Sequence, residues 1–249
     1  MTTWTRHLYE HDPLAIAKGE SNGYSFVHKF GANFDIDNTS EPETVWTGGG
    51  LYPWSVLETA QTLYILSEDN DDTGTLEVQG LDADYNLLTE TITLTGTTAV
   101  ATSNTFLRVY RMVYTDDGAG NLGDITARVT SGTGTVVAHI EAGFSQTLMC
   151  VYTVPAGKTA YMMVGDFSVQ KNKDAQVLML QRAFGTNNFR IAHMAEVYET
   201  TYRYDFPIPL PIPEKTDLDI RADNVETNNT RVTCNFTMVL VNNKIQGEP

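Results

Sequence analysis

The chain has 249 residues, of which 41% are hydrophobic and only 19% are charged. Its 31 acidic residues outnumber its 16 Lys and Arg, which gives a formal net charge of −15 at pH 7. An acidic surface repels phosphate backbones, so this charge disfavours nucleic acid as a partner. No apolar run approaches the ~20 residues that a membrane span needs, and the first residues lack the apolar segment of a signal peptide. We therefore expect a soluble protein that has no membrane partner.

Residues 1–23 are predicted to form an extended N-terminal arm, because large apolar side chains occur there without the alternation of a strand. These side chains are Trp4, His7, Leu8, Tyr9, Leu14 and Ile16. Such a segment either packs on another surface, such as a second copy of the chain, or folds back on its own domain. The sequence does not favour one alternative over the other.

Strand-like alternation follows over residues 24–36, and residues 46–55 then form a loop with three successive glycines. The glycines could cradle a phosphate, but the lysine and the flanking strand and helix of a phosphate-binding loop are missing. The aromatic side chains of this loop could also stack on a sugar ring. We favour a glycine hinge in which Trp46 and Trp54 close one end of a sandwich.

Residues 68–72 form an acidic loop with the sequence EDNDD. Clustered Asp and Asn side chains can bind calcium through oxygen ligands. The glycine and the terminal glutamate of an EF-hand loop are absent, so we interpret this segment as a solvated turn and expect no metal.

The stretch from residue 75 to residue 112 gives the clearest evidence for the fold. Leu76 and Val78 alternate with polar residues, as in a half-buried strand. Residues 82–86 have the sequence DADYN, whose short polar side chains favour a reversal of the chain. A threonine-rich strand follows over residues 87–95, and threonine suits the solvated face of an antiparallel sheet.

Two further hairpins are predicted, one over residues 125–140 and one over 147–170 with residues 155–158 as its turn. Residues 175–184 are apolar on both faces, so we expect a strand that is covered on both sides or buried at a subunit contact.

Three strand predictions complete the chain. Residues 189–206 are predicted to be a strand because of their β-branched and aromatic content. Residues 206–214 have proline at every second position, which predicts an extended sheet edge or a segment of polyproline character. The last strand, within residues 231–243, has a single apolar face formed by Val232, Cys234, Phe236, Met238 and Leu240.

These patterns predict an all-β protein, an antiparallel β-sandwich of jelly-roll-like type with an extended N-terminal arm. Residues 24–249 are expected to form one sandwich domain or, alternatively, two packed sandwiches with a break near residues 143–147.

No catalytic or cofactor-binding motif is present in the sequence. It has no CxxC, HExxH or GxSxG motif, and His139 and His193 fall within predicted strands. Cys150 and Cys234 have apolar neighbours, so we expect two buried, reduced thiols, with a bridge between facing strands as the unsupported alternative. We expect no enzymatic activity, no cofactor and no metal.

Several phrases of the sequence resemble a known protein family. They are GLDADYNLLTETITLTGTTAVATSNTFLRVYR from residue 80, IEAGFSQTLMCVYTVPAGKTAYM from residue 140, EKTDLDIRA from residue 214 and NNTRVTCNFTMVLV from residue 228. Together they resemble virion structural proteins of tailed bacteriophages, especially phages of marine and cyanobacterial hosts. The resemblance covers roughly residues 24–243, and its phrases are structural rather than catalytic.

The resemblance implies a capsid cement or decoration protein that is made in the host cytoplasm and bridges subunits of the major capsid protein on the capsid surface, as a homotrimer. Aromatic residues dominate interface hot spots, so the candidate anchors are Trp4, Leu8, Tyr9, Trp46, Tyr52 and Trp54. The alternative is a receptor- or carbohydrate-binding module of a head fibre or tail. The major capsid protein itself is disfavoured, because no long helix is predicted.

Overall fold

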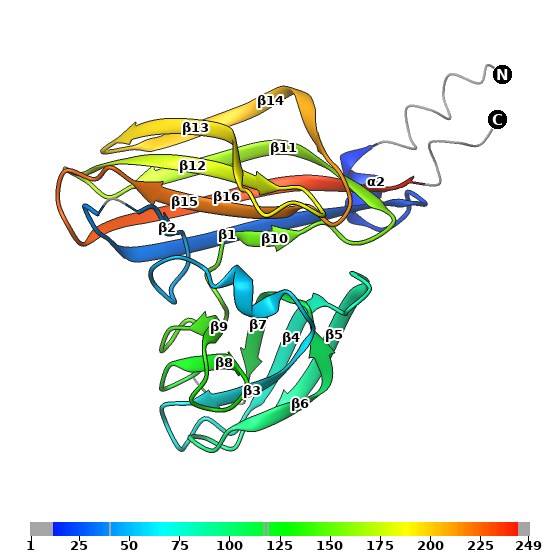
Figure 1. Cartoon of the computed structure of the whole chain (residues 1–249), viewed down its shortest axis with the longest axis vertical. Coiled ribbons are helices and arrows are strands. Elements are labelled where there is room, and N and C mark those ends of the chain that lie inside the picture. Colours follow the sequence, from blue (N-terminus) through cyan, green and yellow to red (C-terminus); the bar gives the residue numbers. More distant parts are fainter. Residues whose placement is uncertain (1–11, 40, 117, 119, 244–249) are drawn as a thin grey trace.

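The computed structural model describes residues 12–39, 41–116, 118 and 120–243. The chain folds into two antiparallel β-sandwiches, each with its own hydrophobic core (Figure 1). The prediction of an all-β sandwich fold is therefore confirmed.

The first sandwich is built from both ends of the described chain. One sheet has the strand order β1 (Tyr24–Ile36), β16 (Thr230–Asn242), β11 (Lys158–Val169) and β14 (Thr201–Ile212). The facing sheet has the order β10 (Val151–Thr153), β15 (Asp217–Asp223), β12 (Asp174–Arg182) and β13 (Arg190–Tyr198), and the short β2 (Glu43–Thr44) pairs with β15. Apolar side chains of the two sheets meet between them and form the core.

The second sandwich consists of consecutive strands. One sheet has the order β6 (Val100–Phe106), β3 (Gln61–Ser67), β8 (Ile125–Val129) and β9 (Val136–Ile140). The other has the order β5 (Leu87–Thr93), β4 (Thr75–Leu81) and β7 (Arg108–Thr115). Because all these strands lie between β2 and β10, the second sandwich is inserted into the first.

In the part of the chain that the structure describes, two short helices accompany the sheets. The helix α2 (Pro13–Ala17) lies within the predicted arm, where Asp12 caps it by accepting a 2.9 Å hydrogen bond from the backbone N–H of Leu14. The 3₁₀ helix η1 (Trp54–Leu57) lies where the chain enters the second sandwich. Among the described residues, no helix is long and apolar enough to cross a membrane.

The strongest sequence patterns correspond to observed strands. The apolar face predicted for the last strand is the buried face of β16, which pairs with β1 on one side and β11 on the other. The DADYN turn joins β4 to β5, and residues 125–140 form the β8–β9 hairpin. Residues 175–184 overlap β12, which lies inside its sheet and buries four consecutive apolar residues, Val177 to Leu180.

The predicted hairpin over residues 147–170 is wrong. Its two halves lie in different sheets, because β10 pairs with β15 whereas β11 pairs with β14 and β16. The turn at residues 155–158 therefore carries the chain across the core from one sheet to the other. Turn residues show where a chain reverses, but they do not show whether the next strand pairs with the previous one or faces it.

Candidate functional site

The three aromatic residues predicted as anchors in the loop at 46–55 lie inside the molecule. Trp46, Tyr52 and Trp54 are 3%, 1% and 5% exposed. Their rings pack edge to face, with centroids 5.2 Å apart between the first two and 4.8 Å apart between the last two. These side chains fill the junction between the two sandwiches and cannot reach a second protein, which corrects the expectation that they anchor a partner.

The remaining predicted anchors, Trp4, Leu8 and Tyr9, lie outside the described residues. The hinge interpretation of the loop is close to what is observed, since the rings close the end of the second sandwich against the first.

A buried ion network joins the two sandwiches at this junction. The Asp217 carboxylate, at the start of β15, accepts hydrogen bonds from Arg108 of β7 at 2.9 and 3.2 Å and from Arg182 of β12 at 2.9 and 2.6 Å. The Arg108 and Asp217 side chains are only 6% and 5% exposed. Buried ion pairs add little net stability, but separating them would leave a buried charge without its counter-ion, which is costly. Because Arg108 belongs to the second sandwich and Asp217 to the first, this cost holds the two sandwiches in one relative orientation.

A second buried carboxylate extends this network. Asp219 is fully buried and accepts hydrogen bonds from Trp54 Nε1 at 2.8 Å, from Thr44 Oγ1 at 3.0 Å and from Arg221 Nε at 2.8 Å. Burial raises the pKa of the Asp219 carboxyl above its ordinary value, and these hydrogen bonds oppose that rise. Its oxygens are occupied by structural contacts, so this cluster has a structural explanation.

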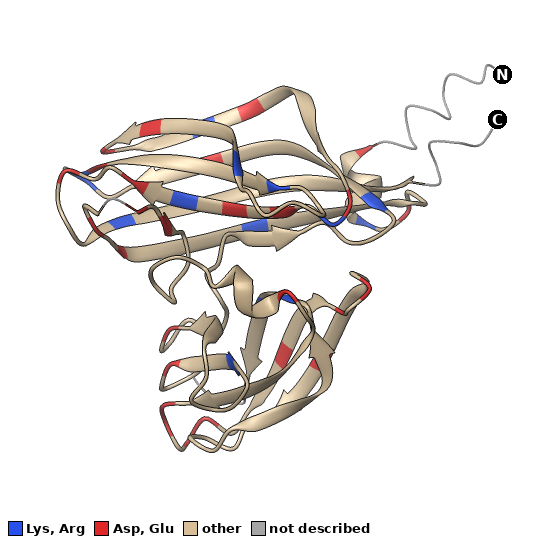
Figure 2. Cartoon of the chain, in the orientation of Figure 1, with Lys and Arg blue, Asp and Glu red and all other residues tan. Residues whose placement is uncertain are grey.

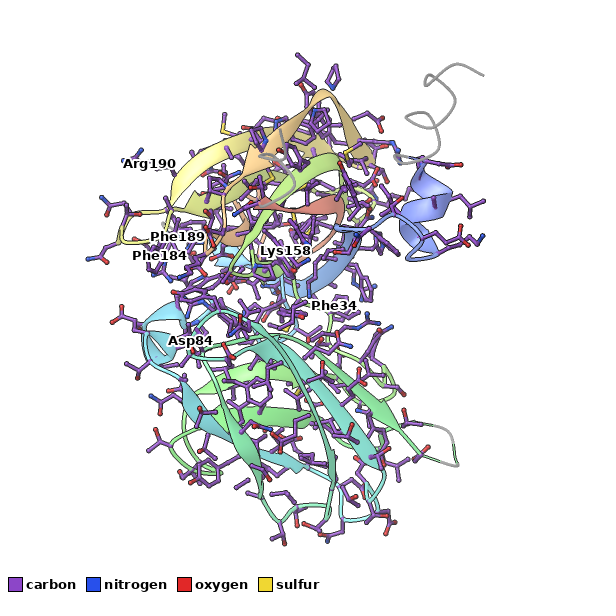
Figure 3. The ribbon with its side chains drawn as sticks, turned by 90° about the vertical axis from the view of Figure 1, so that its right-hand side faces the viewer. Phe34, Asp84, Lys158, Phe184, Phe189 and Arg190 are labelled. Atoms are coloured by element: carbon purple, nitrogen blue, oxygen red, sulfur yellow. The ribbon has the colours of Figure 1, made fainter. Side chains whose placement is uncertain are left out.

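The tip of the β4–β5 hairpin makes a further contact with the first sandwich. The ring of Tyr85 lies edge to face with that of Phe184, with centroids 5.7 Å apart, and the Lys215 ammonium lies 5.4 and 4.9 Å from their centroids. Figure 3 shows this hairpin, marked by Asp84, below the segment that carries Phe184 and Phe189. The junction is thus held at separate points, which favours a fixed angle between the sandwiches.

The acidic loop before β4 contains a buried carboxylate rather than a calcium site. Asp72 is 1% exposed and accepts hydrogen bonds from Ser67 Oγ at 2.5 Å and from the backbone N–H groups of Leu122 and Gly123 at 2.8 and 3.0 Å. No group of three or more His, Cys, Asp or Glu side chains among the described residues could hold a metal. The solvated-turn interpretation fits Asp71, which is exposed, but not Asp72.

A cleft of about 380 Å³ lies between the sandwiches next to Lys29. The Lys29 side chain donates a hydrogen bond to the backbone carbonyl of Tyr110, and burial lowers its pKa to about 8. A partly neutral amine can act as a nucleophile, but no carboxylate lines this cleft to act as its general base. The lysine is therefore interpreted as a buried structural group.

Four strongly exposed apolar side chains of the first sandwich lie on two edge strands. β13 and β14 are the last strands of their respective sheets, on the side of the first sandwich that faces away from the second (Figure 1). Ile191, Met194 and Tyr198 of β13 are 58%, 51% and 66% exposed, and Ile208 of β14 is 85% exposed. We name the surface formed by these four residues the far edge.

The two strands of the far edge are held together by stacked rings. His193 of β13 stacks on Tyr204 of β14 with centroids 4.6 Å apart, and Tyr204 packs edge to face on Phe206 at 4.8 Å. The sequence predicted a single strand over residues 189–206, but the chain breaks at residues 199–200 and forms two strands in different sheets. The edge position predicted for residues 206–214 agrees with β14, but the sequence did not identify the exposed side chains. The sequence signal that could have identified this surface is Ile208, a large apolar residue flanked by two prolines. Because proline cannot donate a backbone hydrogen bond to a neighbouring strand, such a segment belongs at a sheet edge.

The negative charge is concentrated in the other half of the molecule. Residues 54–149 contain 13 of the 31 acidic residues but only 3 of the 16 Lys and Arg. This segment therefore has a net charge of −10, and the rest of the chain has a net charge of −5. Figure 2 shows that many of these acidic residues lie in the loops of the second sandwich. The molecule therefore has an apolar edge at one side and an acidic sandwich at the other.

No protein-family model and no curated protein matches this chain. The features of the molecule that bear on function are the far edge and the distribution of charge.

Proposed function

We propose that this chain is a structural virion protein of a tailed bacteriophage, of the capsid cement or decoration type. The observation that carries the proposal is the far edge, where four large apolar side chains are exposed on two neighbouring edge strands. Exposed apolar side chains in one place mark protein–protein contact surfaces, and edge strands that stay accessible invite a partner. The family resemblance of the sequence supports the same role.

The partner in this proposal is the major capsid protein on the outer surface of the shell. The far edge would face the shell, and the acidic second sandwich would point outward into solvent, where its charge favours solubility. The buried ion network at the junction supports this arrangement, because it keeps the outer sandwich at a fixed angle to the bound one. The proposed role requires neither catalysis nor contact with nucleic acid or membrane.

The proposed assembly is a homotrimer seated where shell subunits meet. Three linked copies would multiply individually weak contacts, because the second and third contacts form at high effective concentration. Light scattering on the purified protein tests this element separately, with an expected mass of three times 27.6 kDa. A monomer at assay concentration would contradict the trimer but not the shell contact.

Shell binding is tested by mixing purified protein with capsids that lack it, and then measuring co-sedimentation and heat-induced release of DNA. Ile208→Asp and Met194→Asp place a charge on the far edge and are expected to weaken binding at least about tenfold, as for interface hot-spot residues. The matched control is Leu122→Asp, since Leu122 is 56% exposed but lies in the second sandwich. Absence of binding by the unaltered protein, or equal loss in all three variants, would reject the proposal.

A second candidate function is a receptor- or carbohydrate-binding module of a head fibre or tail. A cleft at the end of the first sandwich, whose lining includes Gln181, Asn188 and Arg190, favours it.

A further inference from the structure

A cleft of about 300 Å³ opens at the end of the first sandwich, beside the far edge, with which it shares Ile191. It lies where β12 ends and where β13 and β15 begin, and the loop between β12 and β13 forms part of its wall. Its size is at the small end of the range for ligand pockets, so it suits a compact ligand.

Two buried polar atoms without a hydrogen-bond partner line this cleft. These atoms are Gln181 Nε2 and Thr216 Oγ1, and Thr216 is only 2% exposed. Only five such side-chain atoms are found in the part of the chain that the structure describes, and two of the five meet here. Leaving a buried donor unpaired costs about 1–3 kcal/mol, so two of them at one cavity indicate a missing partner.

The strand register explains why both side chains point inward. Gln181 lies on the same side of β12 as Val177 and Met179, whose side chains are in the core. Thr216 lies on the same side as Leu218 of β15, which is also in the core and pairs with Gln181. Both residues therefore face the interior at the open end of the sandwich, where apolar residues give way to polar ones.

The other lining groups define the chemistry of the ligand. Arg190, which pairs with Gln181 in the sheet, contributes a guanidinium group, and Asn188 contributes an amide. Figure 3 places Arg190 at the outer side of the first sandwich, above Phe189. No Asp, Glu or aromatic residue lines the cleft. The site is thus rich in donors, has one fixed positive charge and offers no ring for stacking.

We propose that this cleft binds a sugar acid, that is, a carboxylate with neighbouring hydroxyl groups. Arg190 would bind the carboxylate, because its planar fork of donors matches two carboxylate oxygens. Gln181 would donate to a ligand oxygen, and Thr216 would exchange a hydrogen bond with a ligand hydroxyl. The apolar wall at Pro213 would contact the carbon face of the sugar. The ligand is either a free hexuronate or one unit of an acidic polysaccharide.

Calorimetric titration of the full-length protein tests the proposal with glucuronate, galacturonate, tetragalacturonate and glucose. Uronates should bind, and glucose should bind at least about tenfold more weakly, because it cannot form the ion pair with Arg190. Binding of the tetramer alone would identify a polysaccharide as the source, and binding of the monomers would identify the free acid. No heat with any uronate at up to about 10 mM would overturn the proposal.

Thr216→Val is the decisive variant, because valine has nearly the same shape and lacks only the unpaired hydroxyl. It should weaken uronate binding about tenfold while leaving the melting temperature unchanged or higher, because a buried unpaired group is removed. Thr89→Val, at an exposed threonine of β5, is the matched control and should leave binding unchanged. Equal uronate affinity for Thr216→Val and the unaltered protein would overturn the site.

Arg190→Gln tests the charge. It should reduce the affinity for uronates to that for glucose. A variant that still prefers uronates over glucose would overturn the role of Arg190 in binding the ligand carboxylate. This inference does not depend on the proposed shell contact, so Thr216→Val should still bind capsids normally. Failure of one proposal is therefore distinguishable from failure of the other.

Discussion

Replacing Lys29 with methionine gives the sharpest test of the junction between the sandwiches. Lys29 is 6% exposed on β1, where its ammonium donates to the Tyr110 carbonyl and lies 5.7 Å from the Tyr110 ring centroid. Burial is the largest cause that lowers its pKa from 10.5 to about 8, and the nearby Arg111 acts in the same direction. Folding therefore disfavours the charged form of this lysine.

The size and sign of the effect follow from this shift. A lysine pKa lowered from 10.5 to about 8 corresponds to about 3 kcal/mol at 1.36 kcal/mol per pH unit. Between pH 8 and pH 10.5 the unfolded chain binds more protons at Lys29 than the folded chain does. The free energy of unfolding should therefore rise with pH over this window. The cost of burying the charge is fully present below about pH 8 and is relieved as the pH approaches 10.5.

The assay is urea denaturation of the unaltered protein and of Lys29→Met at pH 7 and at pH 10.5. The unaltered protein should gain about 3 kcal/mol relative to the variant between these two values. Burial raises the pKa of the neighbouring Tyr110 phenol to about 12, but this group is present in both proteins, so its contribution cancels in the comparison. Lys171→Met, at an exposed lysine, should show no such difference. A stability difference between the unaltered protein and Lys29→Met that does not change with pH would refute the reasoning.

Three further outcomes are expected. Asp217→Asn should destabilise the fold by about 3–5 kcal/mol in denaturant titration, because it leaves two arginines without their buried counter-ion, whereas Asp205→Asn, at an exposed ion pair, should leave the stability nearly unchanged. A thiol reagent should leave Cys150 and Cys234 unmodified in the native protein and modify both after unfolding, since both are free and buried; modification of the native protein would contradict their burial. Gly80→Ala should lower the melting temperature, because its new methyl group would lie 2.0 Å from a backbone carbonyl oxygen of β7, and overpacking of this kind typically costs about 1–3 kcal/mol.

Local alternation in the sequence was sufficient to predict individual strands. The apolar face of residues 232–240 and the DADYN turn are local signals, and each corresponds to a single structural feature, β16 and the β4–β5 hairpin. The free, buried state of Cys150 and Cys234 also followed from their apolar neighbours.

Long-range pairing was not predictable from the same signals. The chain reverses at residues 155–158 as expected, but the partner of β10 is β15, more than sixty residues further along the chain. Trp54 was predicted to be a surface anchor because aromatic residues dominate interface hot spots. Its burial depends on Asp219 and Arg182, which are distant in sequence. Gln181 and Thr216 gave no signal at all, since an unpaired polar atom is recognised only when its surroundings are known.

The insertion of one sandwich into the other sets an order for synthesis on the ribosome. All strands of the second sandwich are complete once residue 140 has emerged, so it can fold while the rest of the chain is still being made. The first sandwich must wait, because β1 pairs along its length with β16, the last strand among the described residues. Until then the apolar face of β1 is exposed in the nascent protein. A ribosome that stops before residue 230 would release a chain whose earliest strand has no neighbour.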